Sequence, residues 1–240
     1  MVLNTAPSTS TTVPTMGYAA AAVLAVQREM EADANVVVIG EDVGRGGIFG
    51  QYKGLQQMFG GQRIIDTPIS EAAIMGAGVG MALAGLRPVV EMRVVDFALC
   101  GMDEIVNQAA KNRFMFGGQG RVPLVARMPN GIWDASAGQH SQSLEAWFAH
   151  LPGVVVVCPS TPQDNYALLR ASLQCGDPGG VHGTQNPVGR RRPGGRIRDH
   201  PAGPGRGAAR GQRHHHRQLE QTGAGVCRRL RHPGGAGHPG

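Results

Sequence analysis

The stretch Arg63-Ile-Ile-Asp-Thr-Pro-Ile-Ser-Glu71 decides the fold of this chain. Its opening residues, Arg63–Asp66, predict a short strand, because apolar side chains stand directly before a turn. Ser70 is a typical N-cap residue and predicts a helix that begins at Glu71 and ends at Gly85. A strand that turns directly into a helix is the repeating unit of an α/β protein.

The alternation of strands and helices continues on both sides of this stretch. Strands are predicted at 36–39, 63–66, 88–97, 122–128 and 154–158, and helices at 19–30, 53–59, 71–84, 102–114, 141–150 and 161–174. Thr15 and Thr161 are the expected N-caps of the first and last helices. Consecutive apolar residues in several strands are typical of burial on both faces. The sequence therefore predicts a largely parallel sheet covered by helices on both sides, with ligands in the loops at the carboxyl ends of its strands.

The composition changes abruptly at Pro178–Gly179. Residues 1–178 have a net charge of −4, whereas residues 179–240 carry 12 Arg, only 2 acidic residues, 16 Gly and no aromatic residue. A segment with so few apolar side chains buries too little surface to offset the entropy lost on folding. The sequence predicts a disordered tail over 179–240.

An Arg- and Gly-rich tail also suggests a second class of function, nucleic-acid binding through phosphate contacts. The tail lacks the aromatic side chains on which bases stack, which counts against that alternative. The triplet His214–His216 resembles a set of metal ligands, but a segment without structure gives it no fixed geometry. We expect no nucleic-acid partner.

The remaining features indicate a soluble cytoplasmic protein. Residues 1–14 are rich in Ser, Thr and Pro and predict a disordered leader rather than a signal peptide. No apolar run approaches the ~20 residues that span a bilayer, so no membrane partner is expected. The four cysteines form no Cys-x-x-Cys pair, and this pattern favours a reducing compartment over a disulfide framework.

Two residues are candidates for chemistry. Glu71 follows a helix cap, where a carboxylate gains ~0.3–1 kcal/mol from the helix dipole even without a function. His140 stands in a long polar loop between a strand and a helix, where functional residues concentrate. The glycines of 76–85 lie inside a helix and do not form a dinucleotide loop. The loop Gly44–Gly50 lacks the ending of a P-loop, and we interpret it as a flexible connection.

Several stretches together resemble one known family. They are Gly40-Glu-Asp-Val43, Arg63–Glu71, Ala84-Gly-Leu-Arg-Pro88, Pro129-Asn-Gly131 and Gln139-His-Ser-Gln142. Their order and spacing are similar to those of the beta subunit of the thiamine-diphosphate-dependent decarboxylating component of 2-oxo acid dehydrogenases. That family includes pyruvate, branched-chain 2-oxo acid and acetoin dehydrogenases. The resemblance covers residues 15–178 and implies an incomplete transketolase-like pyrimidine-binding domain.

The resemblance assigns roles to particular residues. Glu71 matches the glutamate that hydrogen-bonds the aminopyrimidine ring of the cofactor, favouring the imino tautomer whose nitrogen then deprotonates the thiazolium ring. Phe97 matches an aromatic residue that packs on the pyrimidine. His140 matches a histidine near the reacting centre, associated with substrate handling or acyl transfer to lipoamide.

The resemblance also implies ligands and partners. A potassium ion bound by main-chain carbonyls would match Leu124, Ser172, Cys175 and Asp177. The chain contains no Gly-Asp-Gly motif, so an alpha subunit is expected to hold the magnesium diphosphate in an α2β2 assembly. The family's C-terminal domain, which docks the acyltransferase core, is missing from this sequence. One alternative is a fragment of a transketolase-type enzyme, although the start at Met1 argues against it.

The resemblance gives the junction a further interpretation. The family continues after the equivalent of Pro178 with a buried strand of the form Val-Val-Tyr-Met-Glu-His-Lys. The observed residues Gly179–Gly189, written as degenerate codons and read one base later, permit Val-Val-Tyr-Met-Glu-His-Lys-Thr-Leu-Trp. We therefore expect a one-base shift near codon 178, a non-native tail and little or no activity for the chain as written. The residues do not choose between pyruvate, branched-chain 2-oxo acids and acetoin.

Overall fold

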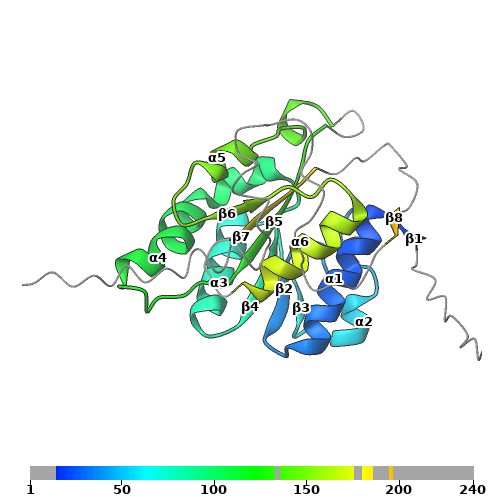
Figure 1. Cartoon of the computed structure of the whole chain (residues 1–240), viewed down its shortest axis with the longest axis horizontal. Helices are drawn as coiled ribbons and strands as arrows, with labels where there is room; N and C mark the ends of the chain where they lie inside the picture. Colours follow the sequence, from blue (N-terminus) through cyan, green and yellow to red (C-terminus); the bar gives the residue numbers. More distant parts are fainter. Residues whose placement is uncertain (1–14, 133–135, 176–179, 186–194, 197–240) are drawn as a thin grey trace, which may run out of the picture.

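The computed structural model describes residues 15–132, 136–175, 180–185 and 195–196, and its centre is one parallel sheet (Figure 1). The strands run in the order β3-β2-β4-β5-β7-β6. Their bounds are β2 Val36–Gly40, β3 Ile64–Asp66, β4 Arg87–Glu91, β5 Val125–Asn130, β6 Val155–Val157 and β7 Gly180–Gln185. A separate antiparallel pair joins β1 (Thr15–Met16) to β8 (Gly195–Arg196). The predicted parallel α/β fold is confirmed.

Helices cover both faces of the sheet. Their bounds are α1 Tyr18–Ala32, α2 Leu55–Phe59, α3 Glu71–Leu83, α4 Ala110–Met115, α5 Glu145–Ala149 and α6 Pro162–Gln174, with 3₁₀ turns η1 Val95–Gly101 and η3 Gly138–His140 and a π-helix η2 Glu104–Ala109. Figure 1 shows α1, α2 and α6 on one face and α3, α4 and α5 on the other. Glu29 of α1 accepts hydrogen bonds from Arg170 Nε at 2.6 Å and Gln174 Nε2 at 2.9 Å, which pins α1 to α6.

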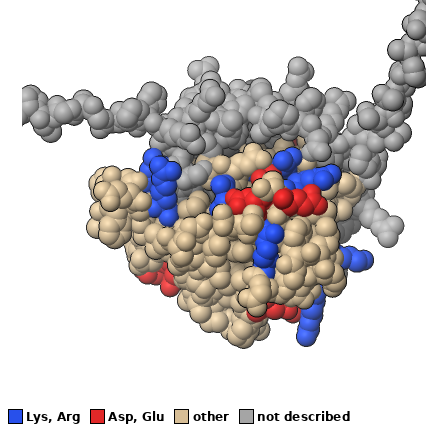
Figure 2. Space-filling model, turned by 90° about the horizontal axis from the view of Figure 1, so that it is seen from below, with Lys and Arg blue, Asp and Glu red and all other residues tan. Residues whose placement is uncertain are grey.

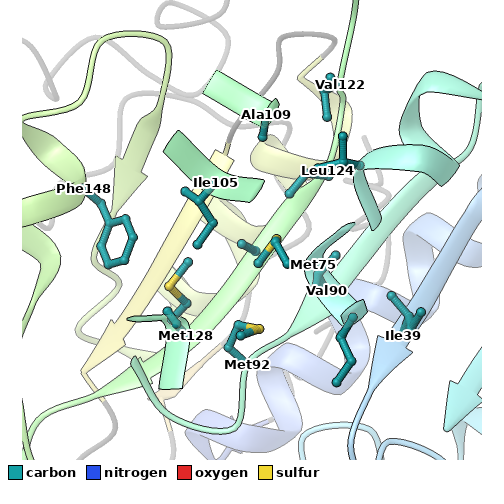
Figure 3. Packing of buried hydrophobic residues seen from close by; sticks show 14 of the residues in the cluster. Ile39, Met75, Val90, Met92, Ile105, Ala109, Val122, Leu124, Met128 and Phe148 are labelled. Atoms are coloured by element: carbon teal, nitrogen blue, oxygen red, sulfur yellow. The ribbon is translucent and has the colours of Figure 1, made fainter. Parts of the chain in front are cut away.

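The sheet divides the core into two hydrophobic clusters. Successive strand residues point to opposite faces, so Val89 packs with α1 and α6 while Val90 packs with α3. Figure 3 shows the second cluster, where Met75 of α3 and Ile105 of η2 lie over Val90 and Leu124. All five residues of β2 and all six of β5 are buried, as expected of central parallel strands.

A glycine in α3 sets how closely that helix approaches the sheet. A Cβ added to Gly78 would lie 2.4 Å from Cγ2 of Val90 on β4, whereas one added to Gly80 would meet nothing within 4 Å. The density of small residues in 76–85 therefore serves helix–sheet contact at Gly78. Gly85 ends the helix in the left-handed conformation with φ +98°, as predicted.

Several predicted boundaries change. The strand predicted over 88–97 ends at Glu91, and the chain then turns into η1, because Asp96 is buried there and accepts a hydrogen bond from a distant loop. The helix predicted over 102–114 is split between η2 and α4. Thr15 belongs to β1, and Gly17 is the N-cap of α1. Thr161 does cap α6, in a reciprocal capping box with Asp164.

The tail differs from its prediction at one point. Residues 180–185 were expected to begin a disordered segment, yet they form β7, which pairs with β5 on one side and β6 on the other. Parallel pairing uses main-chain groups only, so a strand of almost any sequence can fill the gap between β5 and β6. The predicted leader 1–14 and the triplet His214–His216 lie outside the described residues.

Further observations concern membrane-spanning helices, cysteines and surface charge. Among the residues that the structure describes, no helix has the length and apolar character needed to cross a membrane. Cys100 and Cys158 are free cysteines. On the face seen in Figure 2, basic and acidic side chains of the described domain lie beside one another, so that face carries no basic patch of the kind that nucleic acid requires.

Candidate functional site

Glu71 is the first residue of α3 and lies at the carboxyl edge of the sheet. The turn that leads to it is fixed by the Thr67 N–H, which donates to the carbonyl of Gly40 at the end of β2, at 3.1 Å. The side chain is half-buried, and no hydrogen bond or ion pair of its carboxylate exists with any described residue. Thr67 Oγ1 nearby is buried and likewise lacks a partner in the described part of the chain. The turn thus presents one buried polar atom without a partner in the described part of the chain, Thr67 Oγ1, and one half-buried carboxylate, that of Glu71.

A second carboxylate faces Glu71. Glu41 follows β2 directly, its side chain is only 10% exposed, and its Oε2 lies 4.0 Å from Nη1 of Arg93. Burial raises the pKa of the Glu41 carboxyl, the negative charge of Glu71 raises it further, and Arg93 opposes the rise. A buried carboxyl whose pKa is raised beside a second carboxylate is an arrangement typical of sites that hold or move protons.

Phe97 and His140 are in direct contact. Their ring centroids are 5.0 Å apart and their planes are nearly perpendicular, at 85°. Phe97 lies on η1 and His140 ends η3, so the pair joins two irregular segments. Edge-to-face packing of this kind restricts the orientation of both rings.

Two hydrogen bonds hold the His140 loop in place. Gln142 Nε2 donates to Oδ1 of the buried Asp96 at 2.7 Å, and Asp96 is the neighbour of Phe97. The main-chain carbonyl of Gln142 accepts from the Gly131 N–H at the end of β5, at 2.9 Å. Gln142 therefore ties the loop both to η1 and to the sheet.

η1 also connects this pair to Glu71. A Cβ placed on Gly101, at the end of η1, would lie 3.4 Å from the carbonyl oxygen of Glu71 and 3.3 Å from Cβ of Met75. The absence of a side chain at Gly101 lets η1 pack against the first turn of α3. The structure thus brings the three predicted site residues, Glu71, Phe97 and His140, to one edge of the sheet.

Of the residues predicted to bind potassium, those that the structure describes do not lie with Glu71, Phe97 and His140. Ser172 lies in the last turn of α6 and Cys175 is its C-cap, while Leu124 directly precedes β5 and its side chain packs on the face away from α6. Asp177 lies outside the described residues. In the described ranges no group of three or more His, Cys, Asp or Glu side chains could hold a metal ion.

Three residues of this site were not singled out from the sequence. Glu41 and Gln142 stand inside stretches that carried the resemblance, Gly40–Val43 and Gln139–Gln142, so the motifs contained them without revealing their contacts. Asp96 was assigned to a strand, and nothing in its immediate sequence indicates a partner 46 residues away.

Comparisons with known proteins show the family to which the chain belongs. The family model "Transketolase, pyrimidine binding domain" matches residues 14–182. The chain is 45% identical over 164 residues to the 2-oxoisovalerate dehydrogenase subunit beta of Bacillus subtilis, covering 68% of this chain and 50% of that protein. It is 44% identical over 155 residues to the mitochondrial pyruvate dehydrogenase E1 component subunit beta-1 of Arabidopsis thaliana, covering 64% of this chain and 43% of that protein.

A third relative has another substrate in its name. The acetoin:2,6-dichlorophenolindophenol oxidoreductase subunit beta of Cupriavidus necator is 42% identical over 165 residues, covering 64% of this chain and 48% of that protein. The chain therefore spans about half the length of the curated relatives it matches. Among solved structures, a split gene transketolase described as an inactive beta4 tetramer has a similar fold, with a TM-score of 0.54 at 17% identity over 68% of this chain and 48% of that chain.

Proposed function

The chain belongs to the transketolase pyrimidine-binding domain family, and from that premise we propose that it is the beta subunit of a thiamine-diphosphate-dependent 2-oxo acid or acetoin dehydrogenase. Such a component decarboxylates a 2-oxo acid and passes the acyl group to lipoamide. The observation that carries the proposal is the convergence of Glu71, Phe97 and His140 at the carboxyl edge of a parallel sheet, which is where such sheets bind ligands.

The described residues fit the pyrimidine half of the cofactor. Glu71 offers a half-buried carboxylate without a partner among them, and the orphaned Thr67 Oγ1 offers a second polar contact. Phe97 provides an aromatic ring at the same edge of the sheet, in edge-to-face contact with His140. A buried polar group without a partner costs about 1–3 kcal/mol, so a ligand that bonds to Thr67 Oγ1 would recover that energy on binding.

Each of these residues would then have a separate role. Glu71 would hydrogen-bond a ring nitrogen of the pyrimidine, as its counterpart in the family does, and Glu41 would lie near that contact. Phe97 orients the ring, and His140 presents its imidazole to the substrate side. Thiamine diphosphate, when bound, supplies the nucleophilic carbon and stores the electrons released by decarboxylation.

An alpha subunit completes the proposal. The chain has no Gly-Asp-Gly motif for magnesium diphosphate. We therefore assign the magnesium diphosphate to the partner, in an α2β2 assembly, and the resemblance places docking to an acyltransferase core in the family's C-terminal domain.

The potassium site is a finer part of the proposal. Helix C-termini leave carbonyls without helical partners, and α6 ends at Ser172 and Cys175. β7 follows in the chain, and its Gly180 pairs with Val125, the residue after Leu124. Carbonyls from both segments would therefore approach one another. Adding potassium rather than sodium should raise the melting temperature of the full chain if they form such a site.

We also propose that the reading frame shifts by one base near codon 178. One support is the ten-residue sequence, similar to the family's, that is obtained by reading one base later. The other is the position between β5 and β6, which β7 occupies with the residues Gly-Val-His-Gly-Thr-Gln. Resequencing of independent clones tests this point. The proposal is contradicted if every clone has the same junction sequence, without a single-base difference, and if the same genome contains no homologous gene of greater length.

Activity tests the proposal as a whole. The 240-residue chain and a version with one base deleted near codon 178 are each co-expressed with the alpha subunit of a related complex. Pyruvate, 2-oxoisovalerate and acetoin are then assayed with thiamine diphosphate and magnesium. We expect turnover of one substrate class by the frame-restored protein and little by the chain as written. No turnover of any of the three by the restored, assembled protein would overturn the assignment.

A further inference from the structure

A buried ion pair lies beneath the candidate site. Glu91 ends β4 and Arg127 lies on β5, and both side chains are at most 4% exposed. Arg127 Nη1 donates to both carboxylate oxygens of Glu91, at 3.0 Å and 2.9 Å. Desolvation offsets most of the attraction in such a pair, so its net contribution to stability is small and its main effect is on geometry.

The other two hydrogen bonds of Glu91 come from a loop. Gln51 Nε2 donates to Oε1 at 2.9 Å, and Tyr52 Oη donates to Oε2 at 2.6 Å. Both side chains are completely buried. Burial raises the pKa of the Tyr52 hydroxyl, and the charge of Glu91 raises it further, so the hydroxyl remains a donor. The carboxylate of Glu91 is therefore fully satisfied by two consecutive loop residues and one arginine.

Gln51 also organises the glycine-rich loop from inside. Its Oε1 accepts the Phe49 N–H at 2.9 Å, so both ends of the amide are used. A Cβ on Gly47 would lie 2.6 Å from Cδ of Gln51, which shows why a glycine is needed there. This loop, Gly44–Gly50, was expected to be a flexible connection, and its internal hydrogen bonds correct that expectation.

The start of the same loop leads to the site. The Gly47 N–H donates to the carbonyl of Asp42 at 2.8 Å, and the Gly44 N–H donates to Oδ1 of Asp66 at 2.9 Å. Asp42 adopts a left-handed conformation with φ +56° directly after Glu41. The loop thus joins the anchor at Glu91 to the carboxylate that faces Glu71.

We propose that Gln51 and Tyr52, anchored on the buried Glu91–Arg127 pair, are positioning residues that hold the glycine-rich loop and thereby keep Glu41 beside Glu71. The meaning of that position for catalysis rests on the proposed function, but the positioning itself does not. None of the four residues of the anchor touches the ligand site directly; they act through the loop.

The test uses two variants of the full chain and one control. Tyr52→Phe removes one hydrogen bond to Glu91 and keeps the ring. Gln51→Leu removes the bond to Glu91 and the acceptor for Phe49. Lys53→Gln changes the next residue, which is exposed and has no contact with Glu91 among the described residues. Hydrogen exchange of the Gly47 and Phe49 amides, and NMR titration of the Glu41 carboxyl, are measured for each.

We expect loop amides to exchange roughly tenfold faster in Tyr52→Phe and faster still in Gln51→Leu, because a hydrogen bond to a charged group is lost. The amides of α1 and α6 should keep their protection. The Glu41 pKa should fall toward its ordinary value in both variants, because the carboxyl gains water and moves away from Glu71. Lys53→Gln should change neither readout.

Two results would overturn the proposal: loop exchange in both variants equal to that of the control, or faster loop exchange with an unchanged Glu41 titration. In the second case the network holds the loop without positioning Glu41. Neither measurement requires the cofactor or the alpha subunit, so failure of the proposed enzymatic function and failure of this inference are separate outcomes.

Discussion

Strands β2 and β7 both lie inside the parallel sheet, each between two neighbours, but they are made of very different residues. β2 is Val-Val-Val-Ile-Gly and is buried throughout. β7 is Gly-Val-His-Gly-Thr-Gln, with two glycines and a histidine in six residues. Both form main-chain ladders on both sides. Backbone pairing therefore gives a strand its place, while side chains determine how strongly that place is held.

The two regions also differ in what they support. The β2 region carries Glu41 at its end, meets the turn to Glu71, and lies beside the Glu91–Arg127 pair. The β7 region, in the described residues, contributes a ladder and completes the sheet. If this division is right, changes near β2 and β4 should be costly, and changes in β7 should be tolerated or even stabilising.

The largest change in the free energy of unfolding is expected where α3 packs against β4. Gly78→Val places its side chain inside the space of Val90, and neither branched residue can turn away in a packed helix–sheet contact. We expect the free energy of unfolding to fall by about 3 kcal/mol. Urea unfolding measures it. Gly80→Ala is the matched control, because its Cβ meets open space, and it should stabilise the chain by ~0.5–1 kcal/mol.

The second prediction concerns β7. The triple change Gly180→Val, Val181→Tyr and His182→Met restores the residues recovered in the shifted frame. Their partners on β5, Val125–Arg127, are buried. Larger apolar side chains should therefore stabilise the chain by about 2 kcal/mol, the gain from burying roughly one such residue. Thermal unfolding provides the comparison with the parent chain. A lower melting temperature would show that β7 already fits its slot as written.

The third prediction concerns the His140 loop, which begins where β5 ends. Gln142→Leu leaves the buried Asp96 without its hydrogen bond and frees the loop from η1. In the frame-restored protein with its alpha subunit, we expect kcat to fall about tenfold, since a lost hydrogen bond to a charged group costs about 1.5–3 kcal/mol. Gln139→Leu alters an exposed neighbour in the same loop and should leave kcat unchanged. Equal kcat values in the two variants would contradict the role of Gln142 in holding the His140 loop to η1.

The smallest effect is on the pH dependence of stability. Because the Glu41 pKa is raised on folding, the folded chain binds more protons than the unfolded chain between the two pKa values. Stability from this group therefore falls as pH rises through that window, above about 4.3, and then levels. Glu41→Gln should flatten that fall. Chemical unfolding at several pH values between 4 and 7 checks it, and an unchanged slope would mean that Glu41 is not buried against Glu71.

Local sequence patterns predicted most of the fold, and distant contacts account for what they missed. The apolar run of β2 and the Thr161 cap are local signals, and both appear where predicted. The strand predicted through Phe97 was wrong after Glu91, because Val94 and Val95 suit a strand as well as they suit η1. The contact that decides between them is the bond from Gln142 to Asp96, which no local pattern contains.

The candidate site, too, has residues that the sequence predicted and residues that depend on distant contacts. Glu71, Phe97 and His140 came from a resemblance to a family; the structure packs Phe97 against His140 and puts all three at the carboxyl edge of the sheet. The Glu91–Arg127 anchor was not predicted, because each residue looks like one polar position in a separate strand. Pairing them requires the register of β4 and β5, in which Glu91 lies opposite Arg127. That register is a property of the folded sheet rather than of either strand.

The most direct test of the central claim is the decarboxylation rate of the frame-restored protein, assembled with its alpha subunit, after Glu71→Gln. An amide keeps the shape of the side chain but cannot hold the proton, so we expect the rate to fall by about 100-fold or more. Assembly and melting temperature should not change, and Glu31→Gln, on the distant helix α1, should keep the full rate. A Glu71→Gln protein that decarboxylates its substrate within threefold of the parent would contradict the account.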